Sequence, residues 1–247
     1  MSGHSKWSTI KRKKEATDMV RGKLFSKISK TIATAVKGGG SNNPETNSKL
    51  RVAIEEARAA NMPKANVERA LKKGGEGEIS EFTYVGFGPG GICVIVEGAT
   101  DNRNRTGQEI KGIFERGGGS LAGPGAVSFN FKPKCMFLVD KKGNTQNQML
   151  ELIDIGVEDV EETDDGIEIY VDQDKFSKTK DDLESKGQKT IKSELVQNPI
   201  NYHTLDNLSD AKRALAFLEM LEDHEDVYKV FANVNIPDGI LAKIKSQ

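Results

Sequence analysis

The chain has 247 residues, of which 36% are hydrophobic and 30% charged, a composition typical of a soluble globular protein with one large domain or two to three small ones. No uninterrupted apolar run exceeds five residues, as in ICVIV at 92–96, which excludes a transmembrane helix. The two cysteines, Cys93 and Cys135, lie in apolar segments without the spacing of a metal-binding motif. We therefore expect reduced thiols in a protein core.

The net charge of −1 conceals a division between two parts of the chain. Residues 1–75 hold 17 Lys/Arg against 6 Asp/Glu, a net charge of +11, whereas the remaining residues hold 19 against 31, a net charge of −12. A uniform surface would not separate its charges in this way. The division predicts that the N-terminal part meets a polyanion.

The chain begins with a basic stretch, MSGHSKWSTIKRKK. A secretory signal needs an apolar segment after its basic start, and residues 8–20 contain none. A mitochondrial presequence fits the basic character, but Glu15 and Asp18 interrupt the run and the basic pattern continues into a predicted helix. We interpret the stretch as an arm that binds nucleic acid, in which Trp7 either stacks on a base or anchors the arm to the core.

Three helices are predicted within the first 75 residues. The first spans residues 20–36 and ends at three consecutive glycines, and its apolar positions fall on one side: Val20, Leu24, Phe25, Ile28, Ile32, Ala35 and Val36. The second spans about 47–61. The third begins at Pro63 and ends at the glycines 74–75. Together they predict a small basic helical domain.

The first predicted helix carries lysines on the side opposite its apolar positions, namely Lys23, Lys27, Lys30 and Lys37. One interpretation is a solvated helix face, and the other is a surface that contacts phosphates. Acids are nearly absent from residues 1–40, with two against ten basic residues, which favours the phosphate interpretation. Lysine positions a backbone more than it reads bases, so we expect recognition of a nucleic-acid shape more than a sequence.

From residue 79 the pattern changes to short apolar runs typical of strands. The first part predicts strands at 79–87 and 91–99, a helix at 106–116 and a strand AVSFNF at 126–131. The second part predicts a β-α-β-β-α-β order, with strands and helices at 135–140, 145–155, 157–162, 166–172, 174–186 and 190–199. A helix at 209–227 and a strand at 228–235 complete the first part.

The predicted fold class is multi-domain, α and α+β, with an N-terminal three-helix basic domain followed by two α+β sandwich domains. The third, ferredoxin-like domain is inserted in the second. The predicted boundaries are 1–78 for the helical domain, 79–132 plus 205–247 for the discontinuous middle domain, and 133–204 for the inserted domain.

Three loops have a composition that also occurs in binding sites. GFGPGG at 86–91 resembles a phosphate-binding loop, but it lies between two strands and opens no helix, which favours a hairpin turn. GGGSLAGPG at 117–125 is either a loop entering a strand or a close approach to a ligand. EDVEETDD at 158–165 carries six carboxylates without calcium-site spacing, which favours an exposed strand and hairpin over a metal site.

DNRNRT at 101–106 joins a predicted strand to a predicted helix and has two interpretations. In the first, Asp101 or Thr106 caps the helix, and Arg103 and Arg105 pair with acids of a neighbouring domain. In the second, the same arginines, with Asn102 and Asn104, donate hydrogen bonds to phosphates or base edges.

The sequence gives little support for catalysis. The three histidines, His4, His203 and His224, are far apart, and none has metal-ligand spacing. Neither GxSxG nor GxxxxGK[ST] occurs. We expect a protein that is not an enzyme and needs no cofactor, metal or small-molecule substrate.

Several segments together resemble the YebC family, which includes the mitochondrial translational activator of cytochrome oxidase. They are GHSKW at 3–7, YVGFGPGG at 84–91, DNRNRT at 101–106 and the glycine-rich, aromatic segment 118–131. The resemblance implies a three-helix domain followed by two α+β domains, one inserted in the other. It also implies a DNA-binding transcriptional regulator, while mitochondrial and some bacterial members resemble translation factors acting at the ribosome.

The resemblance further assigns His4, Lys6, Trp7 and residues 11–14 to a binding arm, and Asn102 to Arg105 to a central cavity between domains. With the lysine-bearing helix, the predicted nucleic-acid-binding residues are His4, Lys6, Trp7, Lys11, Arg12, Lys13, Lys14, Arg21, Lys23, Lys27, Lys30, Asn102, Arg103, Asn104 and Arg105. The expected partner is DNA, or alternatively ribosomal RNA. A start at MSGHSKW resembles bacterial members, so we expect a cytoplasmic protein, monomeric and without membrane contact.

Overall fold

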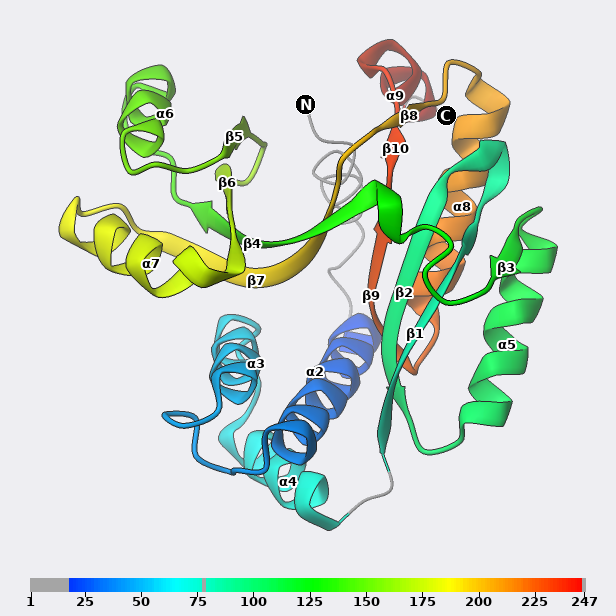
Figure 1. Ribbon diagram of the computed structural model, residues 1–247, viewed down its shortest axis with the longest axis horizontal. Coiled ribbons are helices and arrows are strands. Elements are labelled where there is room, and N and C mark those ends of the chain that lie inside the picture. Colours follow the sequence, from blue (N-terminus) through cyan, green and yellow to red (C-terminus); the bar gives the residue numbers. More distant parts are fainter. Residues whose placement is uncertain (1–17, 77–78, 246–247) are drawn as a thin grey trace.

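The computed structural model describes residues 18–76 and 79–245, and for residues 18–21, 75–76 and 245 it describes the backbone only (Figure 1). Helices combine with two four-stranded antiparallel sheets, so the predicted mixture of α and α+β structure is confirmed. Among the described residues, no helix combines the length and the apolar character that crossing a membrane requires.

The helical unit, residues 18–76, consists of α2 (Asp18–Gly39), α3 (Ser48–Ala59) and α4 (Lys64–Glu76). The Asn47 side chain caps α3 by accepting a hydrogen bond from the Leu50 amide, and it donates one to the Ala35 carbonyl of α2. The buried part of the α2 face begins at Ile28, which is 2% exposed. Leu24, which the sequence analysis placed on the apolar side, lies one turn before Ile28 and is 39% exposed.

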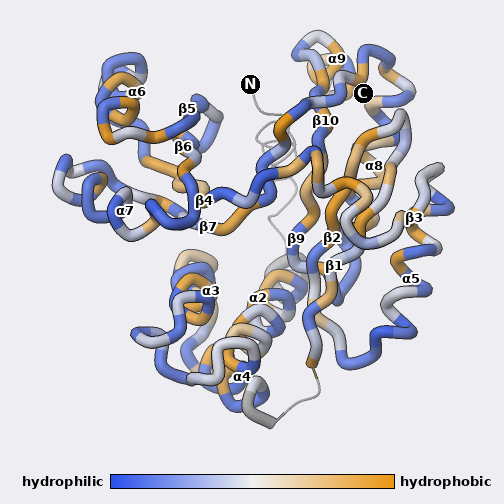
Figure 2. Tube along the Cα trace, viewed as in Figure 1, coloured by the Kyte–Doolittle hydropathy of each residue, from blue (hydrophilic) through white to orange (hydrophobic). Residues whose placement is uncertain are grey.

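The first sheet contains β1 (Ser80–Phe87), β2 (Cys93–Thr100), β3 (Ser120–Ala122) and β9 (Val227–Ala232) in the antiparallel order β3-β1-β2-β9. Helices α5 (Arg103–Arg116) and α8 (Leu208–Asp223) cover one face, where Phe114 and Phe217 meet edge to face. Figure 2 shows hydrophobic residues along β9 and α8. The predicted hairpin at GFGPGG is confirmed, with a 3₁₀ turn at Pro89–Gly91 joining β1 to β2.

Strand β2 reads as a continuous apolar run because both of its faces are covered. Val94 and Val96 pack under α5 and α8, whereas Cys93 and Ile95 point to the other face and pack against the second sheet. Both cysteines are buried free thiols, as expected from the sequence.

The predicted strand AVSFNF at 126–131 is wrong except for its last residue. A turn and a 3₁₀ segment, Ser128–Asn130, carry the chain from one sheet to the other, and Phe129 is 70% exposed. The strand lies earlier, inside the glycine-rich loop, as β3 paired with β1. Gly119 permits this approach, since a Cβ there would lie 2.4 Å from the Phe87 carbonyl oxygen.

The second sheet is formed by β4 (Phe131–Val139), β5 (Asp159–Glu162), β6 (Ile167–Val171) and β7 (Thr190–Pro199), in the antiparallel order β5-β6-β4-β7. Helices α6 (Thr145–Ile153) and α7 (Phe176–Ser185), the latter preceded by the 3₁₀ turn Gln173–Lys175, complete a β-α-β-β-α-β order. Both the element order and the strand order are those of a ferredoxin-like unit.

After β7 the chain returns to the first sheet through β8 (His203–Thr204), α8 and β9. The sequence predicted one strand over 228–235, but Asn233 interrupts it. The Asn233 side chain accepts a hydrogen bond from the Cys93 amide, and β10 (Val234–Asn235) then pairs with β8. A further helix, α9 (Asp238–Lys245), follows that the sequence analysis did not predict.

Candidate nucleic-acid interface

The lysine face of α2, defined as Lys23, Lys27 and Lys30, lies against the C-terminal end of α8 and the segment that leads into β9 (Figure 1). Lys23 pairs with Asp223 at 3.6 Å, with both side chains more than half exposed. The Lys27 ammonium donates to the Glu222 carbonyl, and Lys30 donates to the Glu225 carbonyl at 3.0 Å. Acceptors of the protein itself therefore engage this face, and its contact with phosphate remains a prediction.

Asp226 is the most buried acceptor at this contact, with 2% exposure. Its carboxylate accepts from the Lys30 ammonium at 2.6 Å, the Thr106 hydroxyl at 2.6 Å and the Arg105 guanidinium at 3.0 Å. Burial alone would raise the pKa of Asp226, but the hydrogen bonds from Lys30, Thr106 and Arg105 and the charge of Lys30 outweigh it and lower the pKa to about 2. Asp226 therefore remains ionised and links α2, α5 and the start of β9.

Most of DNRNRT serves the structure of this region. Asn102 caps α5 by accepting from the Arg105 amide at 3.1 Å, so the prediction that Asp101 or Thr106 caps the helix is wrong. Asn102 fills this role because its short amide side chain sits at the first non-helical position. The Arg103 guanidinium donates to the Ser80 hydroxyl and the Glu81 carbonyl of β1.

Arg105 does pair with acids, but they lie beside it in the same α+β unit and not in a neighbouring one: Asp101 at 3.2 Å and Asp226 at 3.0 Å. Of the predicted binding residues in this segment, Asn104 is exposed and has no hydrogen bond through its side chain to another described residue. These contacts favour the first interpretation of DNRNRT, in which its arginines serve the structure. The acids that Arg105 contacts, however, belong to the same α+β unit.

A cleft of about 240 Å³ lies where the helical unit meets both sheets. Its lining includes Thr31 of α2, Val52 of α3, Glu97 of β2 and Tyr228 of β9. Burial, with the nearby charges of Glu81 and Glu97, raises the pKa of the Tyr228 phenol, which therefore stays neutral. Residues 102–105 do not line this cleft, so it does not match the cavity that the family resemblance assigned to them.

Glu109, His224 and Asp226 bring potential metal-ligand atoms within 4.8 Å of one another. The Nδ1 atom of His224 accepts from the Asp226 amide at 3.1 Å, and its Nε2 atom lies 2.9 Å from the Glu109 carboxylate. Because two cationic side chains already engage Asp226, a metal ion would have to displace them. These residues form a hydrogen-bond network and do not fit a metal site.

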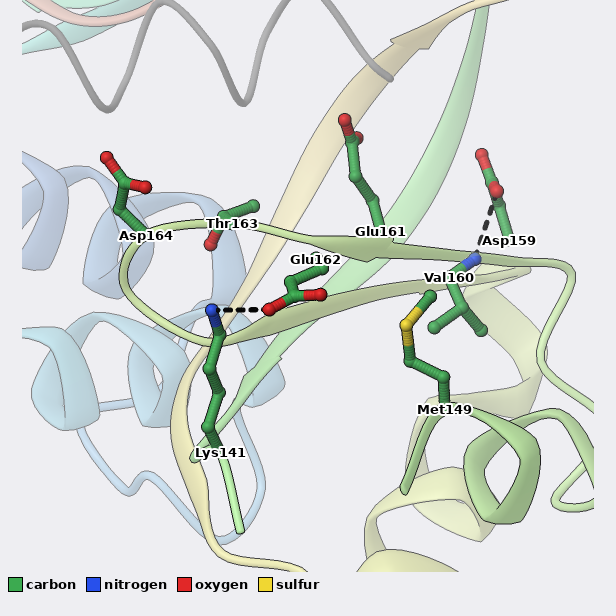
Figure 3. Close-up of a pocket in the computed structure, with 8 residues that line it drawn as sticks. All are labelled: Lys141, Met149, Asp159, Val160, Glu161, Glu162, Thr163 and Asp164. Atoms are coloured by element: carbon green, nitrogen blue, oxygen red, sulfur yellow. Dashed lines mark hydrogen bonds and ion pairs between the residues drawn. The ribbon is translucent and has the colours of Figure 1, made fainter. Parts of the chain in front are cut away.

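The acidic run 158–165 forms the edge strand β5 and its hairpin, as predicted. Figure 3 shows the pocket beside it, with Met149 and Val160 on its apolar side and an ion pair of 2.9 Å between Lys141 and Glu162. The remaining lining is acidic or polar, which is unfavourable for nucleic acid.

Exposed cations that form no ion pair within the described part of the chain lie on the two other helices of the helical unit. Arg51 and Arg58 lie two turns apart on α3, and α4 carries Arg69, Lys72 and Lys73. None of the five forms an ion pair with another residue that the structure describes. The sequence analysis missed them, although their spacing of three, four or seven residues was a usable signal.

The remaining predicted residues lie outside this description. His4, Lys6, Trp7 and residues 11–14 precede the described residues, and the side chain of Arg21 is likewise not described. Their assignment to a binding arm stays a prediction.

Two family models together cover most of the chain. The model described as "TACO1/YebC protein N-terminal domain" matches residues 5–77, and the one described as "TACO1/YebC second and third domain" matches residues 79–234. The chain belongs to the TACO1/YebC family. The family resemblance found in the sequence is thereby confirmed.

Relatives of this TACO1/YebC protein match it from end to end. A protein of Dictyoglomus turgidum is 45% identical over 99% of this chain and 100% of its own length, and one of Syntrophus aciditrophicus is 45% identical over 100% of both. Both are named "Probable transcriptional regulatory protein". A solved structure of a conserved hypothetical protein from Aquifex aeolicus has a TM-score of 0.83 at 38% identity, covering 89% of this chain and 92% of that one.

Proposed function

We propose that this TACO1/YebC protein is a non-enzymatic, DNA-binding regulator of transcription that docks on nucleic acid through its helical unit. The observation that carries the proposal is the set of five exposed cations on α3 and α4 that form no ion pair with another described residue, in a segment with a net charge of +11. The names of the relatives support the regulatory role.

The electrostatics favour one orientation of the complex. Arginine and lysine side chains that neutralise phosphates release condensed counterions, which drives binding at low salt. The rest of the chain carries a net charge of −12 and repels the same polyanion. Nucleic acid is therefore steered to the helical unit and away from the acidic hairpin of the second sheet.

Structured RNA at the ribosome is a second candidate partner. Of the 17 basic residues in positions 1–75, 12 are lysines, which position a backbone without the bidentate base contacts typical of arginine. Such recognition suits the shape of a folded RNA. The same helical unit would then make the protein a translation factor.

The test compares two variants of equal charge change. Arg51→Gln, Arg58→Gln, Arg69→Gln removes three cations from α3 and α4, and the control Lys111→Gln, Arg116→Gln, Lys186→Gln removes three exposed cations elsewhere. Fluorescence anisotropy with a DNA duplex and with a structured RNA, over a range of salt, measures the affinities. We expect the first variant to bind at least tenfold more weakly, with the slope of log K against log salt reduced by about two, since each phosphate contributes about 0.7–0.9.

The control should bind within about threefold of the wild type, because its cations lie outside the proposed surface. Equal losses in the two variants, or a flat salt dependence of the wild type, would contradict docking through the helical unit. Tighter binding of RNA than of DNA by the wild type would favour the translation-factor role.

A further inference from the structure

The helical unit joins the rest of the chain through polar contacts. Its buried apolar cluster contains only residues from within the unit, such as Ile32 and Leu50, and no described member of the clusters of the two sheets. The polar contacts include the lysine face, Lys37 with the Ile79 carbonyl at 2.9 Å, Lys49 with Glu81 at 3.9 Å and Glu55 with Lys180 at 3.3 Å. A contact that buries little apolar surface can open without exposing a core.

The groups that engage the lysine face resemble those of a nucleic-acid backbone. They are two carboxylates and two carbonyl oxygens, from residues 222–226, which meet three ammonium groups along one side of α2. Lys23 and Lys27 lie about 6 Å apart along the helix axis, at roughly 1.5 Å per residue. Successive phosphate oxygens can offer a similar row of acceptors to the same three lysines.

The lysine contacts differ in how easily a competing anion can replace them. The Lys23–Asp223 pair is exposed on both sides, and exposed pairs add little stability and are screened by salt. Lys27 donates to the main-chain carbonyl of Glu222, a group that carries no net charge. The Lys30–Asp226 pair is the strongest, but Asp226 retains Arg105 and Thr106 as partners after Lys30 leaves.

We propose that the lysine face is a concealed binding surface for a phosphodiester backbone, and that the acidic segment 222–226 occupies it until nucleic acid displaces that segment. The proposal rests on the proposed function and adds a second contact to it. The backbone first meets the cations of α3 and α4, and the helical unit then leaves α8, so that Lys23, Lys27 and Lys30 reach phosphates. In the amino-acid sequence, the lysine face follows the basic run of residues 6–14.

A reversible cross-link tests the proposal in the full-length chain. The variant Lys23→Cys, Asp223→Cys is treated with a bismaleimide whose spacer contains a disulfide, which holds α2 against α8. The native thiols, Cys93 and Cys135, are 6% and 1% exposed and do not compete. The control Lys64→Cys, Glu68→Cys replaces an ion pair of 3.8 Å within α4, so that its cross-link joins no two units.

We expect the first cross-link to weaken nucleic-acid binding at least fivefold, and its reduction to restore the affinity. The salt slope should fall by about 1.5 in the cross-linked form, since Lys27 and Lys30 are then withheld from phosphates. Cross-linking the control should change neither quantity. Unchanged binding of the cross-linked first variant overturns the concealed surface and leaves the proposed function intact, whereas a wild type that binds neither nucleic acid overturns both.

A second variant does not depend on cross-linking. Asp223→Asn removes an exposed competing carboxylate, and Asp164→Asn makes the same charge change on the second sheet. We expect the first to bind nucleic acid about twofold to fivefold more tightly than the second, the range typical of one exposed ion pair. Equal affinities of these two variants would count against the proposal.

Discussion

The helical unit and the second sheet both pack on the first sheet, but the two contacts differ in chemistry. Between the sheets, Val85, Ile95 and Phe231 of the first sheet share one apolar cluster with Met136 and Leu138 of the second. Between the helical unit and the first sheet, lysines meet carboxylates and carbonyl oxygens, and a cleft of about 240 Å³ remains. From this difference we expect the two sheets to stay together under conditions in which the helical unit separates from them.

The largest expected effect comes from the apolar contact. Phe231→Ala removes a side chain that is 2% exposed between the sheets, and we expect the free energy of unfolding to fall by about 3–5 kcal/mol. Urea denaturation measures this change. The control Phe129→Ala, at a 70% exposed position, should change it by less than about 0.5 kcal/mol. Similar losses in the two variants would mean that the sheets do not share a core.

The buried ion pair of the polar contact comes next. Lys30→Met leaves Asp226 with Arg105 and Thr106, so we expect a loss of only about 1–2 kcal/mol, less than for a fully orphaned buried charge. Hydrogen exchange should become faster in α2 and stay unchanged in β2. Equal acceleration in both elements would show that the helical unit and the sheet unfold together and would contradict a separable contact.

The pH dependence of stability tests the contribution of ionised Asp226 to the polar contact. The pKa of Asp226 lies at about 2, below the value of roughly 3.9 for an unfolded chain, so its ionised form stabilises the protein above pH 4. That contribution is lost as the pH falls from about 4 towards 2. Denaturation at several pH values should therefore show wild type and Asp226→Asn converging over this range. A constant difference between them would contradict the lowered pKa.

The smallest expected effect belongs to the exposed pair at the same contact. Lys23→Gln removes a partner of Asp223 where both side chains are more than half exposed, and we expect a change in stability below about 0.5 kcal/mol. Its effect on nucleic-acid affinity should be the larger one, a loss of about twofold to fivefold. A stability loss as large as that of Lys30→Met would show that Lys23 has a structural role.

Much of the fold could be predicted because local signals agree with it. The apolar run of β6, predicted at 166–172, and the glycines at the end of α2 gave element positions close to those observed. The strand predicted at 126–131 was wrong because alternating apolar residues are typical of a strand. Val127 and Phe131 are indeed buried, but Phe129 between them is exposed on a 3₁₀ turn. The strand β3 depends on Gly119 lying against Phe87, a tertiary contact that no local pattern carries.

The candidate site could be predicted only in part, for a related reason. Helical periodicity correctly separated the lysines of α2 from its buried positions, such as Ile32. It could not reveal that residues 222–226, almost 200 positions later, would cover them. The exposed cations of α3 and α4, such as Arg58 and Arg69, stand out only when the contacts of the α2 lysines are known.

Hydrogen–deuterium exchange of the full chain, with and without saturating nucleic acid, tests the central claim most directly. The account predicts slower exchange in α3 and α4, where the backbone docks, and faster exchange at residues 222–227, which lose their contact with α2. The amide of Val227 is a sensitive reporter, since it donates to the His224 carbonyl beside this contact. Slower exchange at 222–227 together with unchanged α3 and α4 would contradict both the docking surface and its concealed extension.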